Sequence, residues 1–170
     1  MRVLYLFLPG LAVFFLAGCA GYRLGPVNDA VSGDKTVEVQ PFNNLTFQPR
    51  LGEAVTQGLR ERLQVDGTYR LATREPGDLV ITGVIRSYEP EGLGYLNRDS
   101  ATVQNYRVSV TAHVVVRDRV SGKLVLDRDV KGHTLVNVGP DLASSERQAA
   151  PLLAADLAQN IVELLAEGAW

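Results

Sequence analysis

Apolar and polar residues alternate along residues 106–117, and this stretch constrains the fold more than any other part of the sequence. A period of two is typical of a β-strand that has one face on a hydrophobic core and one face in solvent. A turn at residues 120–123 follows, and residues 124–136 are expected to return beside the first strand. So short a connection favours antiparallel pairing. The sequence therefore predicts an antiparallel sheet.

Two amphipathic helices are expected around these strands. The first has a stripe of Leu and Val every four residues from residue 51 to residue 63, and Asp66-Gly67 is expected to end it. The second follows Ser144 or Ser145, either of which can cap it, and Pro151 leaves two alternatives. We favour a helix kinked at Pro151 over one that begins there. Its expected buried stripe is Leu153, Leu157, Ile161, Leu164 and Leu165.

Shorter strands complete the expected order of elements. Residues 36–40, 69–73 and 78–88 have strand-like patterns, and in the last of these apolar residues occur on both faces. Residues 90–99, which are rich in Gly and polar residues, are expected to form a long loop. The order β-α-β-β-β-β-α predicts an α+β fold, in which two helices pack on one face of a mostly antiparallel, about four-stranded sheet.

The N-terminus has the pattern of an export signal. Arg2 precedes an apolar run over residues 3–17, and small residues stand just before Cys19. A membrane-spanning helix needs about 20 apolar residues, whereas this run is shorter and Pro9-Gly10 interrupts it. An ordinary secretory signal would leave one unpaired thiol in an oxidising compartment, which is unfavourable. Leu16-Ala17-Gly18-Cys19 instead resembles the lipobox of bacterial lipoproteins.

This resemblance implies that the chain is cut before Cys19 and carries covalent lipid there. The expected groups are a diacylglycerol on the thiol and a further acyl chain on the amine, and no other cofactor is expected. Two or more chains anchor a protein durably to a bilayer. Because residue 20 is Ala rather than Asp, the bacterial sorting rule favours the periplasmic face of the outer membrane. The expected division is a signal peptide over 1–18, a lipidated tether over 19–35 and a single domain over 36–168.

The net charge argues against nucleic-acid binding, and the local distribution of charge leaves binding of anionic groups open. The expected mature chain of 152 residues has 16 basic and 19 acidic residues, which argues against a nucleic-acid binder. Residues 98–133 include seven basic residues and four Asp, so their net charge is positive. Residues 141–170 include one Arg and five acidic residues, so their net charge is negative. The basic hairpin is either a site for phosphate or carboxylate groups or an ordinary solvated strand face.

The sequence holds no motif for catalysis. We find no Gly-rich phosphate loop, zinc-ligand cluster or nucleophile elbow. His113 and His133 fall on adjacent predicted strands and could approach one another, but without a third ligand they are interpreted as surface or structural residues. We therefore expect neither catalytic nor metal-binding residues, and the chain is not expected to be an enzyme.

Several short motifs behind Cys19 occur in the order typical of one lipoprotein family. They are Cys19-Ala20-Gly21-Tyr22-Arg23-Leu24, Pro41-Phe42-Asn43-Asn44-Leu45-Thr46-Phe47-Gln48-Pro49, Leu51-Gly52-Glu53, Thr56-Gln57-Gly58-Leu59-Arg60, Tyr69-Arg70-Leu71, Asp78-Leu79-Val80-Ile81, Ser87-Tyr88, Tyr106-Arg107-Val108-Ser109-Val110 and Ser121-Gly122-Lys123-Leu124. Over essentially the whole mature chain, this set resembles the lipopolysaccharide-assembly lipoproteins, the LptE-like family.

The resemblance implies two helices on a mostly four-stranded sheet, and a function. It implies a lipoprotein that helps the outer-membrane β-barrel LptD assemble, plugs it and assists lipopolysaccharide transport to the outer leaflet. Family members bind lipopolysaccharide through basic residues, for which Arg98 and Arg147 are the candidates here. The alternative is a lipoprotein regulator of a periplasmic peptidoglycan synthase, although such proteins usually have a tether longer than residues 21–34. A tethered structural domain without a ligand is a third interpretation.

Overall fold

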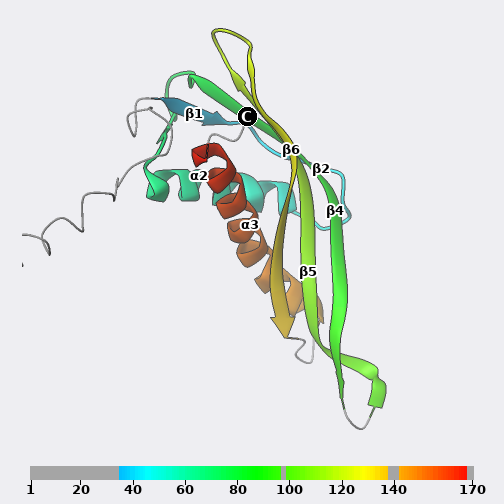
Figure 1. Cartoon of the computed structure of the whole chain (residues 1–170). Helices are drawn as coiled ribbons and strands as arrows, with labels where there is room; N and C mark the ends of the chain where they lie inside the picture. Colours follow the sequence, from blue (N-terminus) through cyan, green and yellow to red (C-terminus); the bar gives the residue numbers. More distant parts are fainter. Residues whose placement is uncertain (1–34, 97–98, 138–141, 168–170) are drawn as a thin grey trace, which may run out of the picture.

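The computed structural model describes residues 35–96, 99–137 and 142–167 (Figure 1). Two helices pack on one face of a mixed, mostly antiparallel sheet, so the predicted α+β class is confirmed. The elements in chain order are β1 (Thr36–Val39), β2 (Asn43–Asn44), α2 (Leu51–Asp66), β3 (Arg70–Leu71), β4 (Leu79–Leu96), β5 (Asp99–Asp118), β6 (Leu124–Asn137) and α3 (Leu142–Ala166).

The sheet has six strands in the order β3-β1-β4-β5-β6, with β2 beside β4. Strands β4, β5 and β6 pair antiparallel, as predicted, and make up most of the sheet. Strands β1 and β2 run parallel to β4, and β3 runs parallel to β1. The sheet exceeds the expected four strands because the short strands β1 and β2 both pair with one side of β4, and β3 pairs with β1.

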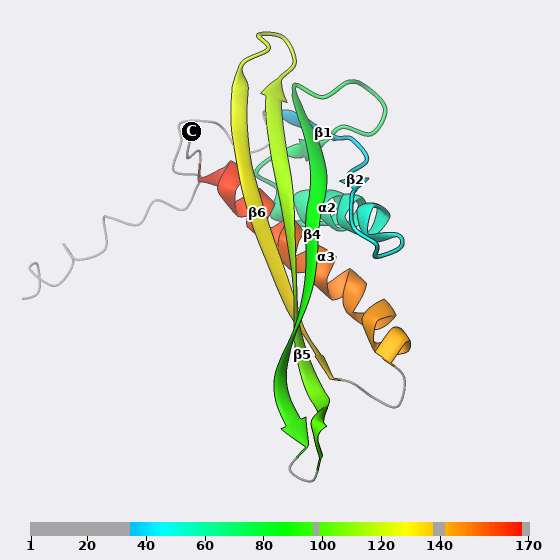
Figure 2. The ribbon, with the colours of Figure 1, turned by 90° about the vertical axis from the view of Figure 1, so that its right-hand side faces the viewer.

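The expected loop over residues 90–99 is wrong, because most of this segment is strand. β4 continues to Leu96 and β5 begins at Asp99, so the two form a long arm that extends beyond the helices (Figure 2). Pairing with β5 satisfies the backbone of this part of β4, although Pro90 and two glycines disfavour a strand locally. No described strand pairs with the other side of β4 beyond Ile85, and a proline is tolerated on such an edge.

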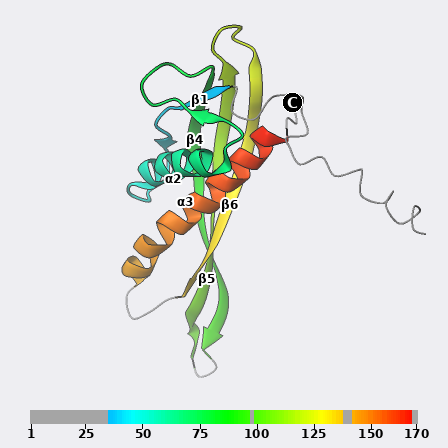
Figure 3. The same ribbon diagram turned by 90° about the vertical axis from the view of Figure 1, so that its left-hand side faces the viewer.

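The core lies between the helices and the sheet (Figure 3). The predicted stripe of α2 is buried, and Gly67 ends this helix in a left-handed conformation, φ 75°, as expected. In α3, Leu153, Leu157 and Ile161 are buried, and Leu164 is partly buried. These side chains pack on the alternate residues of β5, from Val108 to Val116, that face the helices.

α3 starts earlier than the sequence indicated. It begins at Leu142, so Ser144 and Ser145 lie inside its first turns and the predicted cap is wrong. Pro151 lies within the helix rather than at its start, which excludes the second of the two alternatives. Within the described residues, only the segment Arg147–Ala166 is long and apolar enough to cross a membrane, but its apolar stripe packs in the core against the sheet.

Two glycines let elements approach more closely than a side chain would allow. A Cβ on Gly132 of β6 would lie 2.7 Å from the backbone nitrogen of Leu157, so α3 rests directly on this strand. A Cβ on Gly83 of β4 would lie 2.1 Å from the ring of Phe42, which is buried in that space. The backbone N–H of Phe42 donates to the Thr56 hydroxyl at 3.0 Å, which ties the β1–β2 connection to α2.

Side chains of α3 also cover part of the edge strand β6. The Asp156 carboxylate accepts a hydrogen bond from the His133 backbone N–H at 2.8 Å. Asn160 donates from its side-chain amide to the Lys131 carbonyl at 2.8 Å. Unpaired backbone groups of an edge strand are a template for aggregation, and polar groups of a covering helix remove that template. α3 therefore both buries one face of β6 and satisfies part of its edge.

Replacing Gly132 by Ala is expected to lower the free energy of unfolding by about 1–3 kcal/mol, because the new methyl group must displace the backbone of α3. The midpoint of urea unfolding measures this change. Lys131→Ala, one residue away with an exposed side chain, is the control and should change stability little. An unchanged midpoint for Gly132→Ala would show that the close contact is not required.

Candidate functional site

The sheet face opposite the helices is open: no described element covers it (Figure 2). Val80 and Val84 of β4, which suggested that both faces of this strand are covered, are only half-buried on the open face. The register places Ser87, Thr111 and Lys131 side by side across β4, β5 and β6. The open face is therefore a broad, largely polar surface on a rigid sheet.

Charged groups at the centre of this face neutralise one another. A bulge between Ile85 and Ser87 brings out Arg86, whose Nη1 lies 3.0 and 3.2 Å from the Asp129 carboxylate oxygens. His113 Nδ1 lies 2.9 Å from Asp129 Oδ1, and His113 Nε2 lies 3.3 Å from Asp127 Oδ1. Arg86 and Asp129 are about half exposed, so water screens the pair and its energy is small. The cluster suits a wet interface better than an apolar one.

The two histidines do not meet. His113 pairs across the strands with Asp129, and His133 pairs with Ser109, so the two are four residues apart along the sheet. The Nδ1 atom of His133 lies 3.5 Å from Asp156 instead. No group of three or more His, Cys, Asp and Glu residues able to hold a metal occurs in the described part of the chain.

A loop between β2 and α2 presents two large apolar side chains to solvent. Phe47 is fully exposed, and Leu45 is mostly exposed. The loop is nevertheless tightly bonded: the Asn44 side chain accepts from the Thr46 N–H at 3.0 Å and donates to the Gln48 carbonyl at 2.7 Å. The Leu45 N–H donates to the Ile85 carbonyl of β4 at 3.0 Å. We call residues 45–48 the Phe47 loop.

A hollow of about 470 Å³ lies between the Phe47 loop and the bulge of β4. Residues 45–48 line one side of it, and Arg86, Ser87 and Tyr88 line the other. The hollow thus adjoins the open face, since Arg86 and Ser87 belong to both. An exposed aromatic side chain on a preorganised loop beside a hollow is typical of a protein-binding hot spot.

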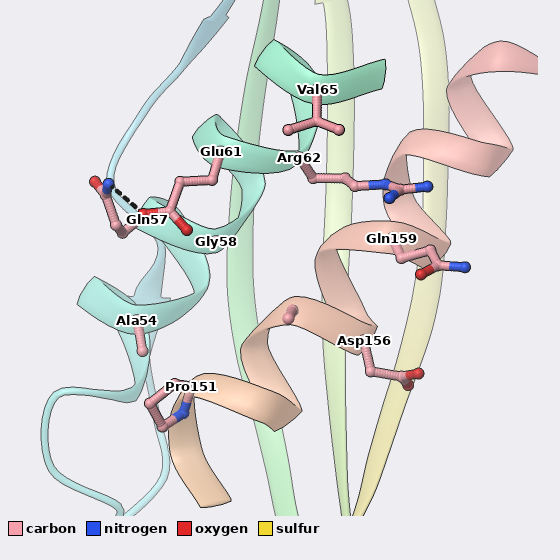
Figure 4. Close-up of a pocket in the computed structure, with 10 residues that line it drawn as sticks. Ala54, Gln57, Gly58, Glu61, Arg62, Val65, Pro151, Asp156 and Gln159 are labelled. Atoms are coloured by element: carbon pink, nitrogen blue, oxygen red, sulfur yellow. Dashed lines mark hydrogen bonds between the residues drawn. The ribbon is translucent and has the colours of Figure 1, made fainter. Parts of the chain in front are cut away.

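A second hollow, of about 620 Å³, lies between α2 and α3 (Figure 4). Its small residues include Ala54, Gly58 and Pro151, and the charged side chains around it include Glu61 and Arg62. Glu61 accepts a hydrogen bond from Gln57, whereas the buried Nε of Arg62 has no partner in the described structure. The charges that line this hollow are of both signs, so it indicates no particular class of ligand.

The structure describes only one of the three residues that are expected to carry lipid or to bind lipopolysaccharide. Cys19 and Arg98 lie outside the described residues. Arg147 is exposed in the second turn of α3, and this end of the helix lies toward the same end of the molecule as the β4–β5 arm (Figures 1 and 2). The expected lipidation at Cys19 and the expected ligand contacts of Arg98 and Arg147 therefore stay predictions.

Comparison with protein families gives a match to the lipopolysaccharide-assembly model LptE over residues 35–165, which is most of the chain. The chain belongs to the LptE family. The resemblance drawn from the sequence motifs is thereby confirmed. Members of this family are lipopolysaccharide-assembly lipoproteins rather than enzymes, and the same holds for this LptE-family chain. No curated protein sequence matches the chain.

Solved structures share the fold of this LptE-family protein at low sequence identity. A protein from Xanthomonas campestris is 10% identical, with a TM-score of 0.57 over 83% of this chain and 90% of its own. A hypothetical protein from Chlamydia trachomatis is 13% identical, with a TM-score of 0.55 over 80% and 96%. A minor lipoprotein from Acinetobacter baumannii is 14% identical, with a TM-score of 0.50 over 78% and 92%. Identities this low establish the fold alone.

Sequence reasoning did not single out the Phe47 loop as a candidate binding element, although its residues carried part of the family resemblance. The available signal was two large apolar residues, Leu45 and Phe47, among Asn, Thr, Gln and Pro without helix or strand periodicity. Their exposure depends on the bonds of Asn44, which only the structure reveals.

Proposed function

We propose that this LptE-family protein is an outer-membrane lipoprotein that binds and plugs an LptD-like β-barrel. In this proposal it is cut after residue 18, is lipidated on Cys19 and faces the periplasm. It helps the barrel assemble and assists the insertion of lipopolysaccharide into the outer leaflet. Confinement to the membrane plane raises its effective concentration at the barrel mouth.

The open sheet face is the observation that carries this proposal. A six-stranded sheet with helices on one side leaves its other side to solvent or to a partner. The interior of a large outer-membrane barrel is polar and holds water. The Arg86–Asp129 pair and His113 already satisfy one another, so the centre of this face can lie against such a wall without leaving these three groups unpaired.

The Phe47 loop supplies the specific contact in this proposal. Aromatic side chains dominate the binding energy of many protein interfaces. Because the Asn44 bonds hold the loop in place, little conformational entropy is lost when Phe47 enters a pocket of the partner. The adjoining hollow can receive a side chain from the partner in return.

Phe47→Ser is expected to weaken association with the barrel about 30-fold or more, because it removes the exposed anchor while leaving the core intact. The measurement is the amount of barrel that co-purifies in detergent with a tagged protein. Val65→Ser is the matched control, since Val65 is an exposed apolar residue, 78%, on α2. If Phe47→Ser retains as much barrel as Val65→Ser, the loop is not the contact. If the wild-type protein retains none, the proposed function is wrong.

Arg98→Glu and Arg147→Glu are each expected to weaken lipopolysaccharide binding about tenfold, because each removes charge-assisted hydrogen bonds to phosphate groups. A pull-down with immobilised lipopolysaccharide measures this. Arg74→Glu, an exposed residue in the β3–β4 connection, gives the same change in net charge as a control. Equal binding by all three variants would remove Arg98 and Arg147 from the proposed site.

A further inference from the structure

The hairpin between β5 and β6 projects beyond the helices at the end of the sheet opposite the arm (Figures 1 and 2). Its turn is held by Asp118, whose Oδ1 accepts from the backbone N–H groups of Ser121 and Val120 at 2.9 and 3.2 Å. These bonds, that from Ser121 above all, keep the pKa of Asp118 below its usual value, so the carboxylate stays ionised. The turn therefore presents Val120, 91% exposed, at a fixed position.

Two cations lie close to Val120 in the chain, one on each side of it. The exposed side chains of Arg117 and Lys123 make no hydrogen bond or ion pair with any described residue. Other charges near the tip are already satisfied. Asp118 faces the Lys35 ammonium at 4.0 Å, and Arg119 pairs with Glu38. Asp78 accepts from the Thr36 hydroxyl at 2.8 Å. The tip thus presents an apolar side chain together with two cations that lack partners among the described residues.

The tether enters the domain beside this tip. Lys35, the first described residue, contacts Asp118 of the hairpin and accepts a backbone hydrogen bond from Arg70 at 3.1 Å. Fifteen residues, 20–34, separate it from Cys19, so an extended chain reaches at most about 50 Å. The lipid anchor is therefore bound to the domain at the end that carries the basic tip.

We propose that the β5–β6 hairpin tip docks on anionic phospholipid headgroups of the bilayer in which Cys19 is anchored, with Val120 inserted between them. This proposal rests on the lipid anchor of the proposed function. Basic residues near an anionic surface are attracted by its potential, and an apolar residue among them enters the interfacial layer. Docking in this way orients the domain, because it fixes at the membrane surface the end of the sheet that lies opposite the β4–β5 arm (Figure 2).

The test attaches an environment-sensitive fluorophore at Val120→Cys in the full lipidated protein, where a modified Cys19 is not available for labelling. The protein is placed in vesicles of phosphatidylethanolamine with phosphatidylglycerol, and in vesicles of phosphatidylcholine alone. We expect a blue shift, and quenching by brominated lipid, only with phosphatidylglycerol. High salt should reduce both, because it screens the attraction. Leu152→Cys, an exposed apolar position, 61%, on α3 and outside the hairpin, is the control and should show neither.

Charge reversal tests the cations directly. Arg117→Glu combined with Lys123→Glu should lower the docked fraction about fivefold for each cation lost. Arg50→Glu combined with Arg74→Glu makes the same change in net charge at two exposed positions outside both the hairpin tip and the proposed binding residues, and should have no effect. Both results together support the proposal.

Three results would overturn the proposal: no shift at residue 120 with phosphatidylglycerol, an equal shift at residue 152, or a shift with lipopolysaccharide micelles alone. Any of these in a protein that still co-purifies with the barrel overturns the docking and leaves the proposed function standing. Docking in a protein that does not co-purify with the barrel would support the docking proposal and overturn the proposed function.

Discussion

The structure depends on the packing of both helices against the same face of the sheet. Val108, Val110 and Val114 of β5 meet Leu157 of α3 and Leu59 of α2 in one buried core. Apolar burial is the main stabilising contribution, and no helix among the described residues packs on the other face. That face is therefore expected to be polar or covered by a partner. The half-exposed ion pairs on it agree with this requirement.

α3 decides where a partner can bind. Its close contact with Gly132, and the bonds of Asp156 and Asn160 to the edge of β6, block strand addition at this part of the edge. A partner therefore meets the broad face and its adjoining Phe47 loop more readily than the edge. The two ends of the domain differ as well, since one holds Lys35 and the β5–β6 hairpin and the other holds the arm (Figure 1).

The periodicity of the sequence predicted the helices and strands that bury one face. It did not predict the structure that comes from pairing between distant segments. The helix stripes and the strand over residues 106–117 were predictable, because their spacing reports one buried face. The strand character of residues 90–96 was not, since it comes from pairing with β5 in spite of Pro90. The Arg86–Asp129 contact, across 43 positions, and the exposure of Phe47 arise only from tertiary structure.

In-cell photo-cross-linking from Thr111 tests the central claim that a barrel covers the open sheet face. Thr111 lies at the centre of this face, between Ser87 and Lys131. A photoreactive residue in its place should form a covalent adduct that contains the barrel polypeptide. The account is contradicted if Thr111 yields no such adduct in cells where the barrel still co-purifies with the protein.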